Sequence, residues 1–189
     1  MTFIEEEKFE HKDYSSTYLK LGEYELCTFF NCNFQNSTLS NFKFVDCEFI
    51  DCNLSNCQLN NTHLQDVKFN NCKLLGLQFE KCKEFGLSFE FNNCLLNQSS
   101  FYQMKIANTS FINSQLKDVD FENCDLTAVN FDNCDLLAAV FDNTILEKCD
   151  FRTSYNYSID LDQNKVKYAK FSLEGTPGLL NKYKITIDK

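Results

Sequence analysis

Hydrophobic residues recur at every fifth position along most of the chain, and this spacing determines the fold that the sequence predicts. On an α-helix, five residues advance about 500°, so these positions would spiral around the axis. On a straight strand, an odd spacing would place them alternately on opposite faces. The series is consistent only if the chain bends once per repeat, as in a solenoid. The repeat centres are Leu19, Tyr24, Phe29, Phe34, Leu39, Phe44, Phe49, Leu54, Leu59, Leu64, Phe69, Leu74 and Phe79 and, after a slip of two residues, Phe91, Leu96, Phe101, Ile106, Phe111, Leu116, Phe121, Leu126, Phe131, Leu136, Phe141, Leu146 and Phe151.

Two further positions of the repeat support this interpretation. Small or modest residues such as Cys27 and Cys32 stand two positions before a centre, which places them on the same side of an extended segment. Asn and Asp, as at Asn31 and Asp46, are common two positions after a centre. Their side chains tolerate left-handed backbone and bond to nearby backbone groups. Each repeat is therefore predicted to be a three-residue strand followed by a two-residue corner.

The number of sides per coil follows from the kind of residue at the centres. From Phe91 to Phe151 the centres alternate between aromatic and aliphatic, which gives a ten-residue period. Three sides per coil would stack Phe on Leu in every column, whereas four sides build separate columns of each. A square coil of about twenty residues is the simpler arrangement.

The segment CDLTAVNFDNCDLLAAVFDN (124–143) resembles the pentapeptide-repeat family, whose consensus is a small residue, Asp or Asn, Leu or Phe, and two polar residues. The resemblance covers roughly residues 17–172. It implies an all-β fold, a right-handed quadrilateral β-helix, and the handedness rests on the resemblance alone. We assign residues 1–172 to this β-helix and 173–189 to a C-terminal cap or dimerisation segment.

Two regions of the predicted β-helix depart from the repeat. Residues 1–18 break the pattern and are expected to form an N-terminal cap. The register break at 80–90 adds two residues, which we interpret as two single-residue bulges, around Glu84 and between Phe85 and Phe91. The break is either a packing irregularity or a recognition feature, because bulges re-aim side chains near functional sites. The residues of this candidate recognition feature are Glu84, Phe85 and Gly86.

The C-terminal segment has its own sequence signals. The only proline, with two nearby glycines, predicts a turn into a short helix near Leu179–Tyr183, followed by a terminal strand. Such a segment can simply cover the last coil, whose unpaired backbone otherwise invites end-to-end addition. Dimerisation is the alternative, because GLLNKYKITI is similar to the ending of Qnr-type members, which dimerise through that end. The candidate dimerisation residues are Leu179, Leu180, Tyr183, Ile185 and Ile187.

Composition argues against catalysis and against a membrane span. The 189 residues fit one domain, and no apolar run approaches the roughly 18–20 residues that a membrane helix needs. The acidic N-terminal stretch has no signal-peptide core, so we expect a cytoplasmic protein. Neither His11 nor His63 has a catalytic or metal-binding partner pattern, and no phosphate loop is present. We therefore expect no enzyme activity, no cofactor and no metal.

The eleven cysteines all occupy the small inward position of the repeat. Their spacings are mainly multiples of five, unlike the paired spacings of zinc sites. We expect free thiols that pack as small hydrophobic side chains. A disulfide between stacked residues such as Cys32 and Cys52 is the alternative, because parallel rungs lie about 4.8 Å apart. A reducing compartment argues against it.

The net charge of −9 is concentrated in one part of the chain. Residues 111–160 carry ten acids and three bases, whereas residues 161–189 carry three acids and six bases. Surface carboxylates attract a partner with a basic groove and repel DNA and membranes, although any solenoid needs charged outward positions for solubility. The candidate acidic face comprises Asp118, Asp120, Glu122, Asp125, Asp132, Asp135, Asp142, Glu147 and Asp150.

The resemblance to Qnr-type quinolone-resistance and microcin-immunity members implies a function. It implies a DNA mimic that binds gyrase or topoisomerase IV and protects the enzyme from quinolones or toxins. A tail-to-tail dimer of two rods, each about 36 Å long, would match some twenty base pairs of duplex. The alternative is an interaction scaffold or regulator whose partner is not a topoisomerase. Neither alternative involves direct binding of nucleic acid or a membrane.

Overall fold

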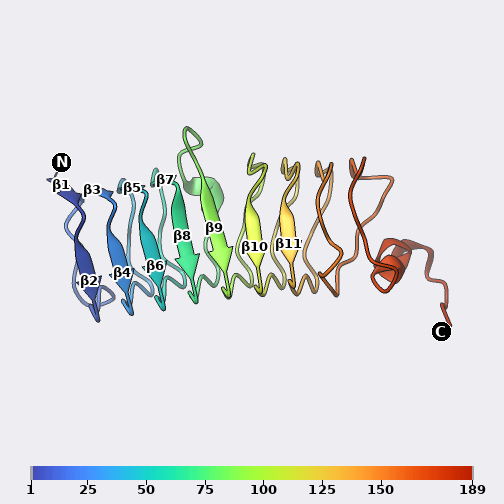
Figure 1. Cartoon of the computed structure of the whole chain (residues 1–189), viewed down its shortest axis with the longest axis horizontal. Coiled ribbons are helices and arrows are strands. Elements are labelled where there is room, and N and C mark those ends of the chain that lie inside the picture. The colour runs from blue at the N-terminus through green and yellow to red at the C-terminus, as the bar shows by residue number, and fades with distance from the viewer. Residues whose placement is uncertain (1, 189) are drawn as a thin grey trace.

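The computed structural model describes residues 2–188, and in it the coils of the chain stack in a single row (Figure 1). Residues that pair across neighbouring coils are twenty apart, as in Phe29↔Phe49 and Phe111↔Phe131. All strand pairs are parallel. Four five-residue repeats therefore complete one coil, and the predicted quadrilateral β-helix is confirmed.

Two of the four sides contain regular strands, and the other two are held by isolated bridges such as Gln115↔Asp135 and Ser100↔Asp120. The sheets have the orders β1-β3-β5-β7 and β11-β10-β9-β8-β6-β4-β2. The strands are β1 (Thr2–Glu5), β2 (Lys8–Glu10), β3 (Gly22–Glu25), β4 (Thr28–Phe30), β5 (Lys43–Val45), β6 (Glu48–Ile50), β7 (His63–Gln65), β8 (Val67–Asn70), β9 (Phe89–Asn92), β10 (Ser110–Ile112) and β11 (Asn130–Asp132). The 3₁₀ helices are η1 (Phe79–Lys81), η2 (Thr176–Leu179) and η3 (Asn181–Tyr183).

We number the sides by their order along the chain, because each side carries a different set of outward residues. Side 1 holds the sheet β1-β3-β5-β7 and continues past Ile106 and Leu126, and side 2 holds the longer sheet. The centres of side 3 include Phe34, Leu54, Leu74, Leu96, Leu116 and Leu136. The centres of side 4 include Leu39, Leu59, Phe79, Phe101, Phe121 and Phe141.

The corners use the left-handed backbone that the sequence predicts. Asn31 and Asp46 have φ values of 49° and 50°, and the corners of most other repeats match them. Short amide and carboxylate side chains tolerate this conformation better than other non-glycine residues. Ala128 and Ala138 adopt it too, both at φ 58°. The square cross-section is thus encoded locally, once in every repeat.

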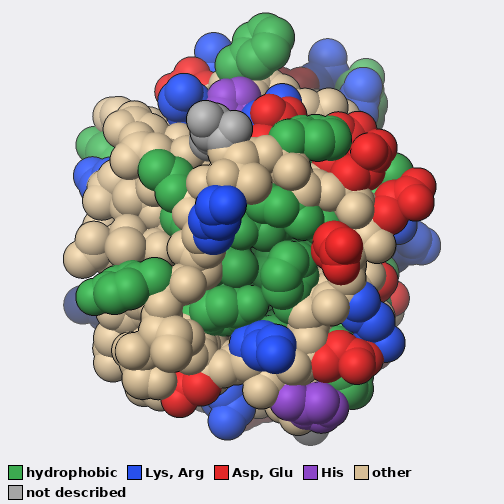
Figure 2. Space-filling model, turned by 90° about the vertical axis from the view of Figure 1, so that its left-hand side faces the viewer, with side chains coloured by type: hydrophobic (Ala, Val, Ile, Leu, Met, Phe, Trp, Pro, Cys, Tyr) green, Lys and Arg blue, Asp and Glu red, His purple; other side chains and the backbone are tan. Residues whose placement is uncertain are grey.

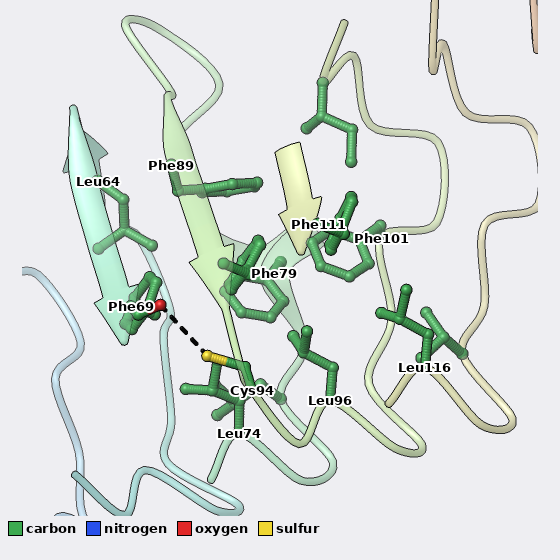
Figure 3. Packing of buried hydrophobic residues seen from close by; sticks show 14 of the residues in the cluster. Leu64, Phe69, Leu74, Phe79, Phe89, Cys94, Leu96, Phe101, Phe111 and Leu116 are labelled. Atoms are coloured by element: carbon green, nitrogen blue, oxygen red, sulfur yellow. Dashed lines mark hydrogen bonds between the residues drawn. The ribbon is translucent and has the colours of Figure 1, made fainter. Parts of the chain in front are cut away.

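The interior of the tube is filled by columns of stacked side chains (Figure 3). The ring centroids of Phe91 and Phe111 are 5.1 Å apart with nearly parallel planes, and those of Phe111 and Phe131 are 5.2 Å apart. Phe101 meets Phe111 edge to face, at 5.8 Å and 88°. Both geometries are favourable for aromatic pairs. Phe111, Phe121 and Phe131 are completely buried, so the predicted phenylalanine ladder is confirmed.

All eleven cysteines are free and buried, which confirms the prediction of unpaired thiols. Nine of the eleven Sγ atoms donate to backbone carbonyls of the preceding coil, as from Cys94 to Phe69 (3.3 Å; Figure 3) and from Cys134 to Phe111 (3.3 Å). Burial raises the pKa of the Cys134 thiol to about 12. A buried neutral thiol of this kind is a poor nucleophile, so Cys134 acts in packing.

The prediction of an N-terminal cap was wrong, because the repeat begins earlier than Leu19. Strand β1 pairs with β3 and β2 pairs with β4, so the residues from Thr2 onward form the first coil. The side chains of Ile4, Phe9 and Tyr14 occupy the interior, and the Phe9 ring stacks on that of Phe29 at 4.8 Å. These three residues continue the five-residue spacing. Figure 2 shows apolar side chains at the centre of this end of the tube, with charged side chains along part of their rim.

The predicted two-residue slip is confirmed, but its form differs from the prediction. Strand β8 pairs with β9 at an offset of 22, as in Val67↔Phe89. The extra residues form one turn rather than two separate bulges, since the Leu87 N–H donates to Glu84 and Gly86 has a φ of 71°. This turn projects from the row of coils (Figure 1). It replaces the side 1 strand of its coil, because the backbone of the four residues Glu84–Leu87 makes no hydrogen bond to a neighbouring coil within residues 2–188.

The C-terminal segment is partly as predicted. Its helix, expected near Leu179–Tyr183, is present as two short 3₁₀ helices, η2 and η3. The expected terminal strand through Ile185 and Ile187 is absent from the residues that the structure describes. A strand needs a neighbour to accept its backbone hydrogen bonds, and among residues 2–188 no backbone group bonds to Ile185 or Ile187. Met1 and Lys189, the outer ends of the two predicted regions, lie outside the described residues.

Candidate partner-binding surfaces

The nine carboxylates of the predicted acidic face do not share one face. Side chains lie on the same side of this fold when they are twenty residues apart, and the nine are distributed otherwise. Asp125 and Glu147 lie on side 1, in the coils that follow Ile106. Asp132 and Asp150 lie on side 2 and Asp135 lies on side 3. The prediction grouped carboxylates that are close in sequence, whereas in the solenoid neighbouring repeats lie on different sides.

The other four carboxylates do lie together, on side 4 and its leading corner. Asp120 belongs to the side 4 column that includes Ser100, and Glu122 lies beside it across Phe121. Asp118 occupies the corner before them, with φ 55°, and Asp142 lies in the next coil. Asp118 and Asp142 are exposed, and Asp120 and Glu122 are half-exposed. These four residues are the core of a real acidic surface.

Asp135 is a structural residue rather than a surface contact. Only 7% of the residue is exposed, and its carboxylate is 3.1 Å from Lys117 Nζ and accepts a hydrogen bond from Asn156 Nδ2 at 2.8 Å. Burial raises the pKa of this carboxyl, but the bonds from Asn156 and Lys117 outweigh it and leave the pKa below its usual value. An occupied, covered carboxylate has little to offer a partner, which corrects its predicted role.

Two more of the predicted carboxylates are occupied by neighbours in their own chain. Asp150 pairs with Arg152, whose Nη2 is 2.7 Å away, and this hydrogen bond lowers the pKa of the carboxyl. Asp125 accepts bonds from the backbone N–H (3.0 Å) and the hydroxyl (2.6 Å) of Thr127. Both interactions stabilise the local turn. These two carboxylates contribute to the negative electrostatic field of the whole protein more than to a defined binding face.

Sequence reasoning missed two carboxylates that extend the side 4 surface. Asp160 and Asp162 flank Leu161, forty residues after Asp120 and Glu122, which is the side 4 position by sequence spacing. Lys182, from the C-terminal segment, bonds to both of them. The signal was available, because grouping outward residues at intervals of twenty would have found them. We call Asp118, Asp120, Glu122, Asp142, Asp160 and Asp162 the acidic strip.

The turn at the register break exposes an aromatic side chain. Phe85 is 87% exposed, whereas its neighbour Leu87 is half-buried and packs against the core. Glu84 and Gly86 complete the turn and are exposed. The three residues of the predicted recognition feature therefore lie together at one protruding point.

The five predicted dimerisation residues differ in burial. Leu179 packs against the core and Leu180 is half-buried, so both cover the end of the tube. Tyr183, Ile185 and Ile187 are exposed by 58%, 58% and 49%. Exposed large apolar side chains in a group mark an interaction surface.

The part of the chain that the structure describes contains no grouping of three or more His, Cys, Asp or Glu side chains suited to a metal ion. His63 lies between Lys43 and the region of Lys83, and burial, then these two lysines, lowers its pKa. Among residues 2–188, no helix is long and apolar enough to cross a membrane.

The profile of the pentapeptide repeat region matches residues 23–90 and 78–155 of this chain. The chain belongs to the pentapeptide-repeat family. No curated protein matches it in sequence. Individual members are therefore compared with this chain through their solved structures.

Solved structures of other pentapeptide-repeat proteins share this fold. A trypsin-treated form of QnrB1, described as a plasmid-mediated fluoroquinolone resistance protein, is 14% identical with a TM-score of 0.64, over 99% of this chain and 100% of that one. HetL, from the cyanobacterium Nostoc sp. strain PCC 7120 and described as involved in heterocyst differentiation regulation, is 13% identical with a TM-score of 0.55, over 92% and 87%. At these identities the likeness shows the fold alone.

Proposed function

We propose that this pentapeptide-repeat protein is a DNA mimic that binds the basic DNA groove of a type II topoisomerase such as gyrase. The observation that carries the proposal is the acidic strip. The outward positions that flank Phe101, Phe121 and Phe141 on side 4 contain no lysine or arginine. Side 4 therefore presents Asp120, Glu122 and Asp142 in successive coils with no lysine or arginine beside them on that side, whereas Lys182 pairs with Asp160 and Asp162 farther along. A groove that binds duplex phosphates attracts such a surface.

The rigidity of the rod supports this proposal. The strip stands on the filled interior, where Phe121 and Phe141 are stacked at 5.3 Å, so its carboxylates keep a fixed spacing. Parallel rungs are about 4.8 Å apart, which sets that spacing along the axis. A preorganised row of charges loses little conformational entropy when it enters a groove. The fold that the chain shares with QnrB1 adds support, and the fluoroquinolone resistance in that protein's description is extended to this chain as part of the proposal.

A supercoiling assay with purified gyrase and ciprofloxacin tests the proposal. We expect the protein to restore supercoiling, and we expect a triple variant, Asp120→Asn, Glu122→Gln and Asp142→Asn, to need at least about tenfold more protein for the same rescue. The amides keep the size of each side chain and, at Asp120, an oxygen that can accept the Glu122 N–H (2.8 Å). The loss would therefore reflect charge.

The matched control removes the same amount of charge from other sides. Asp125→Asn, Asp132→Asn and Glu147→Gln also change three carboxylates to amides, on sides 1 and 2. If both triple variants lose rescue equally, net charge rather than the strip is responsible. If the wild-type protein gives neither rescue nor inhibition at micromolar concentration, the topoisomerase proposal is rejected.

The proposal includes a homodimer through the C-terminal segment, because Tyr183, Ile185 and Ile187 are exposed beyond what a cap requires. We expect size-exclusion chromatography with light scattering to give twice the 22.1 kDa chain mass. The double change Ile185→Asp and Ile187→Asp should give the single-chain mass, because it places two charges in an apolar interface. Phe85→Asp, at a distant exposed site, is the control and should leave the mass doubled. A wild-type mass of one chain would reject the dimer.

The second candidate function is a scaffold or regulator whose partner is not a topoisomerase. The observation that favours it is the protruding Phe85, which stands on side 1, away from the acidic strip. A single exposed aromatic residue on a turn is a common anchor for a protein partner. This candidate predicts that Phe85→Ala removes partner binding while the triple amide variant of the strip retains it.

A further inference from the structure

The hydrogen-bonded ladder of side 1 stops at the register break. The sheet β1-β3-β5-β7 ends at β7, because the backbone of Glu84–Leu87 forms a turn that projects from the row of coils instead of adding the next strand. The following side 1 segment, Lys105–Ala107, has its bridge on the far side, to Asp125. One rung is therefore missing on this side, while side 2 continues without interruption through β8 and β9.

The missing rung leaves an unpaired strand edge. Among residues 2–188, no group bonds to the backbone N–H or C=O of Lys105 or of Ala107. One coil later, the equivalent residues Asp125 and Thr127 bond to the preceding coil through both carbonyls, at 3.0 and 2.9 Å, and through the Asp125 N–H, at 2.9 Å, while the Thr127 N–H bonds to Asp125 Oδ1 within its own turn. Both Lys105 and Ala107 are exposed. The edge thus presents the Lys105 N–H as a ladder donor and the carbonyls of Lys105 and Ala107, two residues apart, as acceptors.

A cavity lies along this edge. Its volume is about 250 Å³, and it is lined by the segment 105–109, by residues 87–90 after the turn, and by residues 66–68. Figure 3 shows the adjoining interior, with Leu64 of β7 and Phe89 of β9. An open space beside unpaired backbone groups is what an added strand requires, since the incoming backbone must come within hydrogen-bond distance.

The charges around the cavity are unequal at its two ends. Lys43 and His63 are paired neighbours on side 1, and the Lys83 N–H donates to Thr62, which continues the same column toward Lys105. That column therefore places basic side chains on successive coils of an otherwise acidic protein, at the end of the cavity where the Lys105–Ala107 segment begins. Asp66 and Glu90 line the other end, with Lys68 between.

We propose that an extended peptide segment of a partner protein, with an acidic residue at one end, adds to this edge as a strand. Extended polypeptide presents alternating acceptors and donors at intervals of two residues, about 6.6–7 Å, which is the spacing of the Lys105 and Ala107 groups. Its acidic end faces Lys83 and Lys105. This surface lies on side 1 and is independent of the acidic strip on side 4.

Fluorescence anisotropy with two labelled heptapeptides tests this proposal. The probes are Asp-Thr-Val-Thr-Val-Thr-Lys and the reversed sequence Lys-Thr-Val-Thr-Val-Thr-Asp, one for each strand direction. We expect one of them to bind with a Kd below about 100 µM. The same peptide with N-methylated valines keeps every side chain but loses backbone donors, and it should bind at least tenfold more weakly. Failure of both probes, or equal binding of the methylated peptide, would overturn the proposal.

Two further measurements locate the bound peptide. Lys83→Glu with Lys105→Glu should weaken binding at least tenfold, whereas Lys165→Glu with Lys167→Glu, two exposed lysines farther along side 1, should not. Hydrogen exchange should show the Lys105 and Ala107 amides unprotected in the free protein and protected in the complex. Protection elsewhere, or equal effects of the two double variants, would reject this site.

Discussion

Replacing Phe111 by alanine should lower the free energy of unfolding by about 3–5 kcal/mol, the usual loss for a fully buried phenylalanine. The Phe111 ring is stacked between Phe91 and Phe131 and meets Phe101 and Phe121 edge to face. The neighbouring coils are bonded to each other through the backbone, so they cannot collapse into the cavity. Urea denaturation followed by circular dichroism measures the change.

The matched control is Phe85→Ala, which removes the same atoms from a side chain that is 87% exposed. Its effect on the free energy of unfolding should be within about 0.5 kcal/mol. If Phe111→Ala also falls within that range, the phenylalanine column is not what stabilises the tube.

Replacing Gly178 by alanine should detach the C-terminal segment from the last coil. A Cβ atom there would lie 2.2 Å from the carbonyl oxygen of Tyr157, and backbone cannot move aside as a flexible side chain can. The Gly178 carbonyl also accepts the Ile159 N–H at 3.1 Å. We expect a loss of about 1–3 kcal/mol, as for other overpacked sites, and faster hydrogen exchange confined to η2, η3 and the last coil.

The control for this change is Asn181→Ala, an exposed position in the same segment. It should leave exchange in η2 and in the last coil unchanged. Because the C-terminal segment carries the proposed dimer contacts, Gly178→Ala should also shift the mass in light scattering toward that of one chain. Unchanged exchange in Gly178→Ala would show that the segment is not docked as described.

The five-residue repeat made most of this fold predictable from sequence. Each repeat specifies its own bend, because an inward centre such as Phe131 is followed by a corner residue such as Asn133 with left-handed backbone. Local encoding of this kind needs no long-range information. The alternation of Phe and Leu then indicated four sides per coil, because four sides stack Phe on Phe and Leu on Leu, whereas three sides would stack Phe on Leu.

The first coil escaped prediction although its centres follow the same spacing. Ile4, Phe9 and Tyr14 are in phase with Leu19, but Glu7 stands where later coils have a cysteine or another small residue. Among the described residues no coil lies below Glu7, so its side chain can remain exposed. A consensus drawn from interior coils therefore fails where a coil has only one neighbour.

The acidic surface shows a second limit of prediction from sequence. Charge counted along the chain selected nine carboxylates, of which Asp118, Asp120, Glu122 and Asp142 share a surface. The column period of twenty was already in the sequence and would have separated them by side. The burial of Asp135 was not, because it depends on how Lys117 and Asn156 from other repeats fold over its carboxylate.

By itself, the sequence determined the solenoid, its four sides, its phenylalanine column and the position of its one two-residue slip, because each depends on residues within a few positions of one another. Only the tertiary structure decided which carboxylates lie together, how the slip removes a strand from side 1, and how η2 and η3 close the last coil. Those features depend on contacts between coils, where backbone groups of Lys105 or Gly178 find a partner or lack one. No spacing along the chain records such contacts.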